Sequence, residues 1–475
     1  MNKSIIKSIF IGTALSLCAC TANFEDINTK PYEVTDGDME ADDYMLRAPL
    51  VEMQGYVIPN EVNLNQFNNC LLAGSFGGYF ADSNDGFKQK YSTYNPEEHW
   101  VQVPFNDIIP KIYQNFMKLQ NATVPNYMLT SVAKITKVIA LLPVTDTYGP
   151  IPYTQIGADA KLTAPYDSEE TIYKTMFEEL NEAINYLTEF QTENFSPLAD
   201  KVYGGVTVNW IRLANSLKLR LAIRISNVEP ELAKEMAESA VNHEVGVFTS
   251  NKDNAEFTTT RNPYKVVMYE YNGGDSRISA DITTYMNGFN DPRREKYFTE
   301  SAFTGNDDKG EPIINGFAGL RNGVIVPKGD YKLYSNMVVK DTDKLLWMNA
   351  AEVAFLRSEG ALKGWNMGGS AESFYKQGVE LSFEQWGAGS ADAYLADSNS
   401  TPVIYKDPQG FFSTKTAASK VTIKWNDSDD PELKLEKIIT QKWIANFPLG
   451  HEAWAEFRRT GYPKLMSVVD NRSAG

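Results

Sequence analysis

Apolar residues recur at helical spacing along most of the chain. Behind the acceptor-rich segment Asp167–Glu170, apolar side chains return every three or four residues as far as Leu187, the pattern of a capped amphipathic helix. A second such stretch covers 207–226. The same spacing predicts further helices near 39–54, 105–120, 126–142, 230–243, 277–289, 346–364, 370–385, 432–447 and 452–459. The chain is therefore predicted to be mainly α-helical.

Two of the predicted helices form a unit of recognisable length. Residues 349–383 read as one helix, a glycine-rich turn and a second helix, and their length is close to the roughly 34 residues of a tetratricopeptide repeat. Gly360 and Gly378 fall inside these helices, where Gly costs about 1 kcal/mol relative to Ala. Close packing of the two helices would explain them. With the pair in 167–226, this unit predicts a scaffold of tetratricopeptide-like helix pairs.

Long stretches without helical spacing separate the predicted helices. They cover 55–104, 247–276, 298–344 and 387–431 and are rich in Gly, Asn, Asp, Ser and aromatic residues. Loops of this length in a compact domain are usually functional or contain small strands. No linker-like segment interrupts them, so we expect a single composite domain over 39–475 with long loop insertions and minor β-strand content.

The N-terminus has the pattern of an export signal. Lys3 and Lys7 precede an apolar run, Ser8–Leu17, which is too short for a spanning helix of about 20 residues. The run ends in Leu-Cys-Ala-Cys20, which resembles a bacterial lipobox. We predict a signal peptide at 1–19, lipidation of Cys20 and a polar tether over 20–38. A plain secretory signal with incidental cysteines is the alternative.

Cysteine count and charge narrow the picture further. If Cys20 is lipidated and Cys18 is removed, only Cys70 remains, so no intramolecular disulfide is predicted. The net charge is −16, which disfavours nucleic acid as a partner. No other apolar run approaches spanning length, so acyl chains in the outer-membrane lipid are the only predicted membrane attachment.

The motifs of common enzyme classes are missing. His243 and His451 each precede a Glu, but the second histidine of a zinc-protease helix would fall at Val247 or Ala455. No nucleophile elbow, phosphate-binding loop or dinucleotide fingerprint occurs. We therefore predict no catalytic residue and no enzymatic activity.

Two oxygen-rich turns are the only hints of a metal site. They are Asp82–Gly86 and Asn306–Glu311, and each lacks the bidentate Glu that ends a calcium loop. Solvated turns are the favoured interpretation and structural calcium the weaker one, so no metal site or cofactor is predicted.

Aromatic residues are dense in the irregular stretches, notably in 76–100, 264–275 and 317–334. Flat rings beside Asn, Asp and Arg suit sugar rings or extended peptides. The alternative is that most of these rings pack loops onto helices. The candidate ligand-binding residues are Tyr79, Trp100, Tyr271 and Tyr331, and the first three are expected to be exposed.

Four stretches resemble one family. They are FEDINTKPYEVTD (24–36), VTDTYGPIPYTQ (144–155), VNWIRLANSLKLRLAIRIS (208–226) and IITQKWIANFPLGHEAWAEFRRTGYPKL (438–465). Together they resemble the SusD/RagB family of nutrient-binding outer-membrane lipoproteins of Bacteroidetes, and more narrowly its SusD-like second subgroup.

The resemblance implies a helical fold on tetratricopeptide-like pairs and a lipid-anchored location on the cell surface. It further implies a SusC-like TonB-dependent transporter as partner and an oligosaccharide as ligand, with peptide ligands in some members. It implies no catalytic residue. A peptide-binding member of the same family and a lipid-anchored glycan hydrolase are the alternatives.

The last stretch, 438–465, carries two further expectations. Trp443, Phe447, Trp454 and Phe457 lie at helical spacing around a Pro448–Gly450 turn, which favours a core joint over ligand contact. The resemblance implies that family members continue for several tens of residues beyond this block, so either the sequence is truncated at Gly475 or this chain lacks that tail.

Overall fold

The fold is taken from a computed structural model, which describes residues 44–122, 126–157, 163–303, 306, 310, 316–325 and 330–473. The predicted signal peptide, Cys20 and the tether lie outside the described residues, as does most of the turn at 306–311.

Most predicted helices are present. They are α4 (Tyr44–Gln54), α7 (Ile109–Gln120), α8 (Tyr127–Tyr148), α9 (Glu169–Glu189), α10 (Thr207–Ile225), α11 (Pro230–Val241), α13 (Ala280–Gly288), α15 (Ala350–Leu362), α16 (Ala371–Trp386), α18 (Pro431–Ala445) and α19 (Gly450–Thr460). The mainly α fold class is confirmed.

The chain also contains short elements that the spacing did not predict, most of them in the irregular stretches. The helical ones are α5 (Val62–Asn65), the π-helices η2 (Gln66–Gly74) and η4 (Pro104–Ile108), α6 (Glu98–Val103), α12 (Pro263–Tyr269), α14 (Arg294–Tyr297) and α17 (Asp392–Ala396). Single 3₁₀ turns cover Tyr91–Thr93, Pro197–Ala199, Asn251–Asp253, Tyr271–Gly273 and Asp330–Leu333.

Two small antiparallel sheets provide the expected minor β content. Strand β1 (Phe80–Asp82) pairs with β3 (Ser276–Ile278), and β2 (Ala255–Phe257) pairs with β4 (Leu345–Met348). The predictions of helices from residues 277 and 346 were wrong at their starts, where β3 and β4 lie. Leu345–Met348 is apolar throughout, a pattern that does not separate a buried strand from a helix, and pairing with β2 decides the conformation.

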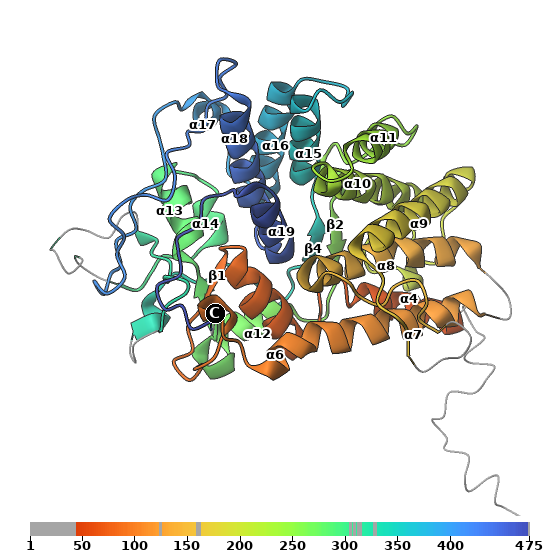
Figure 1. Cartoon of the computed structure of the whole chain (residues 1–475), viewed down its shortest axis with the longest axis horizontal. Coiled ribbons are helices and arrows are strands. Elements are labelled where there is room, and N and C mark those ends of the chain that lie inside the picture. Colours follow the sequence, from red (N-terminus) through yellow and green to blue (C-terminus); the bar gives the residue numbers. More distant parts are fainter. Residues whose placement is uncertain are drawn as a thin grey trace, which may run out of the picture.

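Neighbouring helices in the chain pack against each other as pairs. The contacts join α8 with α9, α10 with α11, and α15 with α16. Figure 1 shows α9, α10 and α11 on one side of the molecule, α13, α14 and α17 on the other, and α15, α16, α18 and α19 between them. The C-terminal helix α19 therefore lies between α9, α10 and α11 on one side and the short helices α14 and α17 on the other.

The start of α9 differs in detail from the predicted cap. Ser168, not Asp167, is the N-cap, and its hydroxyl accepts from the backbone N–H of Thr171. The Asp167 carboxylate instead accepts from the backbone N–H groups of Tyr153 and Thr154. It thus fixes the loop that connects α8 to α9.

Helix α8 is long and apolar enough to cross a membrane by length and composition, contrary to the expectation that no run beyond the signal approaches spanning length. Within the protein, 78% of its apolar window is buried. This burial is typical of the central helix of a folded domain.

Gly378 confirms the expected close approach of α15 and α16. A Cβ atom at this position would lie 2.6–2.8 Å from three ring atoms of Phe355, and the Phe355 side chain is itself fully buried. Packing against Phe355, and not an unusual backbone conformation, therefore requires glycine at position 378.

We expect Gly378→Ala to lower the free energy of unfolding by about 1 kcal/mol. Overpacking costs about 1–3 kcal/mol, which outweighs the gain of about 1 kcal/mol in helix propensity. Urea unfolding measures the change, with Glu380→Ala on the exposed face of the same helix as the control. A variant as stable as the parent would show that Phe355 can move away.

Candidate ligand-binding surface

Tyr79 is not exposed, contrary to the expectation from the sequence. Its side chain has an exposed fraction of 0%. The ring stacks on Trp443 with centroids 5.6 Å apart and an interplanar angle of 13°, and the hydroxyl donates to the Trp443 carbonyl at 2.5 Å. Tyr79 is a core residue that joins the loop after η2 to α18, and it offers no face to a ligand.

Trp100 is also covered, with an exposed fraction of 7%. It lies on α6, a short helix that packs on η2. Phe67 and Phe87 contact its ring at centroid distances of 5.7 and 4.9 Å. The expected exposure was wrong because neighbouring rings from the same irregular stretch cover Trp100.

Tyr271 and Tyr331 are half-buried and keep part of their surface free. The Tyr271 hydroxyl donates to Asn63 Oδ1 at 3.2 Å. The two tyrosines lie in neighbouring segments, since a Cβ on Gly273 would come within 2.3 Å of Lys332 Nζ. Both therefore remain candidates for ligand contact.

A group of partly exposed rings brings together residues far apart in the sequence. Phe76 lies at its centre, 4.7 Å from Trp454 and 6.2 Å from Tyr94 between ring centroids. The interplanar angle with Tyr94 is 26°, and the Tyr94 side chain is 47% exposed. We call Phe76, Tyr94 and Trp454 the aromatic surface.

The sequence pointed to only part of this surface. Phe76 and Tyr94 belong to the aromatic-rich stretch 76–100, but neither was singled out. Trp443, Phe447 and Trp454 belong to one block and were all expected in the core. Trp443 and Phe447 are buried, but Trp454 is not. Trp454 lies on the opposite side of α19 from the residues that pack inward, and it is half-buried.

The backbone of Tyr94 adopts an unusual conformation. Its φ of 60° and ψ of 24° are left-handed, which is uncommon for a bulky residue and costs on the order of 1–3 kcal/mol. The neighbouring Asn95 N–H donates to the Lys90 carbonyl, and the Thr93 carbonyl accepts from the Arg472 N–H. These bonds hold the turn that displays the Tyr94 ring.

Buried polar groups support this turn from beneath. The Ser92 hydroxyl donates to Asp82 Oδ2 at 2.6 Å, and Lys90 Nζ lies 4.0 Å from the same oxygen. Burial raises the pKa of Asp82 and lowers the pKa of Lys90. The Asp82 carboxylate of the suspected calcium turn is thus engaged by protein groups. Across the described ranges, no group of three metal-ligating side chains occurs.

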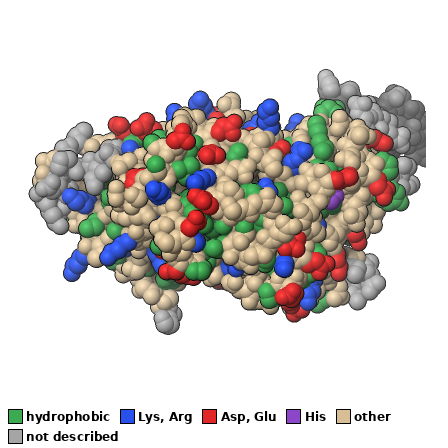
Figure 2. All heavy atoms as spheres, turned by 90° about the horizontal axis from the view of Figure 1, so that it is seen from above, with side chains coloured by type: hydrophobic (Ala, Val, Ile, Leu, Met, Phe, Trp, Pro, Cys, Tyr) green, Lys and Arg blue, Asp and Glu red, His purple; other side chains and the backbone are tan. Residues whose placement is uncertain are grey.

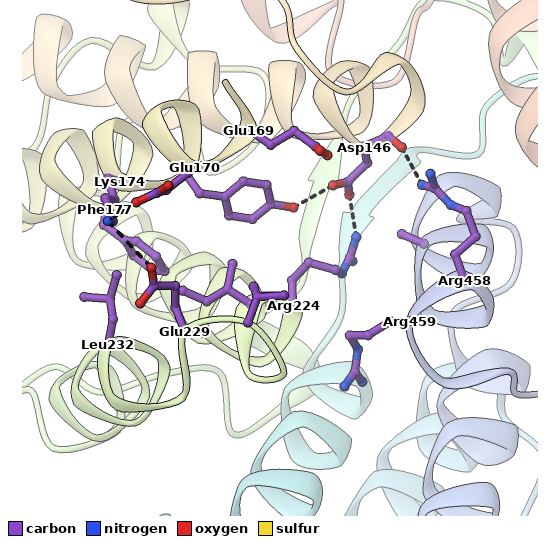
Figure 3. A pocket seen from close by; sticks show the side chains of 14 residues that line it. Asp146, Glu169, Glu170, Lys174, Phe177, Arg224, Glu229, Leu232, Arg458 and Arg459 are labelled. Carbon is purple, nitrogen blue, oxygen red and sulfur yellow. Dashed lines mark hydrogen bonds and ion pairs between the residues drawn. The ribbon is translucent and has the colours of Figure 1, made fainter. Parts of the chain in front are cut away.

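Arg458 borders the aromatic surface on the side away from Tyr94. Its guanidinium lies 4.2 Å from the centroid of the Trp454 ring, and its Nη2 donates to the Asp146 carbonyl near the end of α8. Arg458 thus bonds a carbonyl near the C-terminal end of α8. Beyond Arg458 opens a cavity of about 540 Å³ between α8, α9, α10, α11 and α19 (Figure 3). We call it the interhelical pocket.

A buried ionic network holds α19 in this position. Glu452 accepts from Arg224 Nη2 and from Lys442 Nζ. Arg459 forms two bonds of 2.7 Å with Glu359. Burial alone would raise the pKa of Glu452, but Arg224, Lys442 and Arg220 together hold it well below its ordinary value. The network joins α10, α15, α18 and α19 beneath the pocket.

The comparison of the whole sequence with protein families decides the family. The family model for SusD-like proteins, described as Susd and RagB outer membrane lipoprotein, matches residues 26–475. The chain belongs to the SusD-like family. No curated protein matches the chain.

Solved structures of SusD-like proteins agree with this assignment. A SusD homolog from Bacteroides uniformis is 47% identical, with a TM-score of 0.87 over 91% of this chain and 90% of the other. A homolog from Bacteroides thetaiotaomicron is 41% identical, with a TM-score of 0.83 over 90% and 87%. A chitin-binding SusD homolog from Flavobacterium johnsoniae is 35% identical, with a TM-score of 0.82 over 90% and 89%.

Proposed function

We propose that this SusD-like protein binds a glycan on the aromatic surface at the outside of the cell. The observation that carries the proposal is the exposed Tyr94 ring, stacked on Phe76 and held by left-handed backbone. A flat, rigidly held ring beside polar loops suits the apolar face of a sugar. The chitin-binding homolog from Flavobacterium johnsoniae supports a glycan over other nutrients.

The proposed location and partner follow from the family. Its members are described as outer membrane lipoproteins, which agrees with lipidation of Cys20 and a tether over 20–38. We propose that the protein delivers its ligand to a SusC-like TonB-dependent transporter and does not hydrolyse it. Tyr271 and Tyr331 are proposed as further contacts for a ligand that extends over the neighbouring loops.

We expect Tyr94→Ala to weaken glycan binding about fivefold or more, because a stacked ring contributes about 1 kcal/mol. Isothermal titration calorimetry with oligosaccharides of N-acetylglucosamine, alongside a panel of other glycans and peptides, measures the change. Tyr127→Ala is the matched control, since that tyrosine is 62% exposed but lies at the start of α8.

Three outcomes would contradict the proposal. Equal affinity of Tyr94→Ala and parent would place the site elsewhere, with Tyr271 and Tyr331 as the next candidates. Binding of peptides alone would favour the peptide-binding alternative. Release of shorter sugars from the glycan by the purified protein would show that it is a hydrolase.

A further inference from the structure

The interhelical pocket has an apolar end that faces solvent. Phe177 on α9, Ile225 at the end of α10, Val228 in the following turn and Leu232 on α11 form this end. Val228 is 76% exposed, so a ligand group that covers it removes apolar surface from water. The end is aliphatic in character, because the Phe177 and Tyr173 rings are themselves buried and offer no open face for a sugar.

Most charges that line the pocket are already paired. Lys174 contacts Glu170 and Glu229, the latter at 3.7 Å. The Asp146 carboxylate accepts from the Tyr173 hydroxyl at 2.6 Å and from Arg224. These pairs form the wall of the pocket and leave little capacity for a ligand.

Two opposite charges keep unused hydrogen-bonding capacity. Across the described residues, no hydrogen bond or ion pair reaches the Glu169 carboxylate, whereas the Arg458 guanidinium uses only Nη2. Both line the pocket, and Glu169 contributes to the electrostatic environment of Arg458. Figure 3 shows them on either side of Asp146, at the end of the pocket opposite Phe177 and Leu232.

We infer that the interhelical pocket binds a small zwitterion with an aliphatic side chain, an α-amino acid or dipeptide of the leucine type. Its ammonium group donates to Glu169, and its carboxylate accepts from Nη1 of Arg458. Its side chain covers Val228 and Leu232. The cavity of about 540 Å³ lies within the usual range of small-molecule sites.

Other ligand classes use only part of this arrangement. A simple cation leaves the Arg458 guanidinium unpaired, and a simple anion leaves Glu169 unpaired. Charge-assisted hydrogen bonds are roughly twice as strong as neutral ones, so a ligand that satisfies both groups is preferred. The inference goes beyond glycan binding and does not depend on it.

Calorimetry of the purified protein with three probes tests the inference. Leucine carries both charges, leucinamide lacks the carboxylate and 4-methylpentanoate lacks the ammonium group. We expect leucine or leucyl-leucine to bind and each single-charge probe to bind at least tenfold more weakly. Glu169→Gln should weaken leucine binding at least tenfold and leave 4-methylpentanoate binding unchanged.

Glu178→Gln is the matched control, because Glu178 is an exposed glutamate on the same helix that does not line the pocket. It should bind leucine like the parent. Absence of binding to leucine and leucyl-leucine at millimolar concentration would overturn the inference, as would equal affinity for leucine and leucinamide. Glycan binding measured on Glu169→Gln should be unchanged, which separates this site from the aromatic surface.

Discussion

Glu452→Gln lowers the free energy of unfolding by about 3–5 kcal/mol, the usual effect of removing one partner from a buried ion pair. Glu452 is buried and receives Arg224 Nη2 and Lys442 Nζ, with Arg220 Nε 3.6 Å away. The neutral amide fits the same space but removes the negative charge that balances the positive charges of Arg224, Lys442 and Arg220. Because the network joins four helices, we expect the whole fold to lose stability.

Urea unfolding followed by circular dichroism measures this effect. Glu372→Gln is the control, since Glu372 pairs with Lys376 at 2.7 Å on the exposed face of α16. Exposed pairs contribute less than about 1 kcal/mol. If Glu452→Gln behaved like this control, the network would not stabilise the position of α19.

Acid destabilises the protein through the same network. Although burial opposes ionisation, Arg459 and Lys442 lower the pKa of Glu456 from 4.5 to about 2. The folded state therefore binds this proton less readily than the unfolded state. The stabilisation from Glu456 is fully present above about pH 5 and is lost as the pH falls toward 2. At about 1.4 kcal/mol per pKa unit it amounts to about 3 kcal/mol.

Thermal unfolding between pH 7 and pH 3 tests this pH dependence. We expect the melting temperature of the parent to fall more steeply below pH 5 than that of Glu456→Gln, so that the two curves converge in acid. Asp82 and Asp281 act in the opposite direction, because burial raises their pKa values. They titrate in both proteins, so the difference between the curves isolates Glu456. Parallel curves would contradict the prediction.

Local sequence patterns predicted the helical scaffold well. The spacing of apolar residues located α9, α10 and α16, and Gly378 correctly indicated close packing of α15 and α16. Errors occurred where two conformations share one pattern. Leu345–Met348 is a strand because β2 lies beside it. The cap of α9 is Ser168 because Asp167 is bonded to the preceding loop.

Exposure of the aromatic residues could not be predicted in the same way. In the sequence Tyr79 follows a glycine-rich segment and Trp100 a polar one, yet Trp443 covers Tyr79 and Phe67 and Phe87 cover Trp100. Trp454 looked like a core residue because it follows the buried Trp443 at helical spacing. Its contact with Phe76 depends on how α19 docks onto η2.

By itself, the sequence determined the helical class, the family resemblance and a proposed lipid anchor at Cys20, because each depends on residues close together in the chain. Tertiary structure decided which rings face solvent and which charges remain unpaired. Tyr94 and Trp454 both contact Phe76, and Glu169 and Arg458 line the same pocket. These arrangements depend on contacts between helices hundreds of residues apart in the chain, which no local sequence pattern encodes.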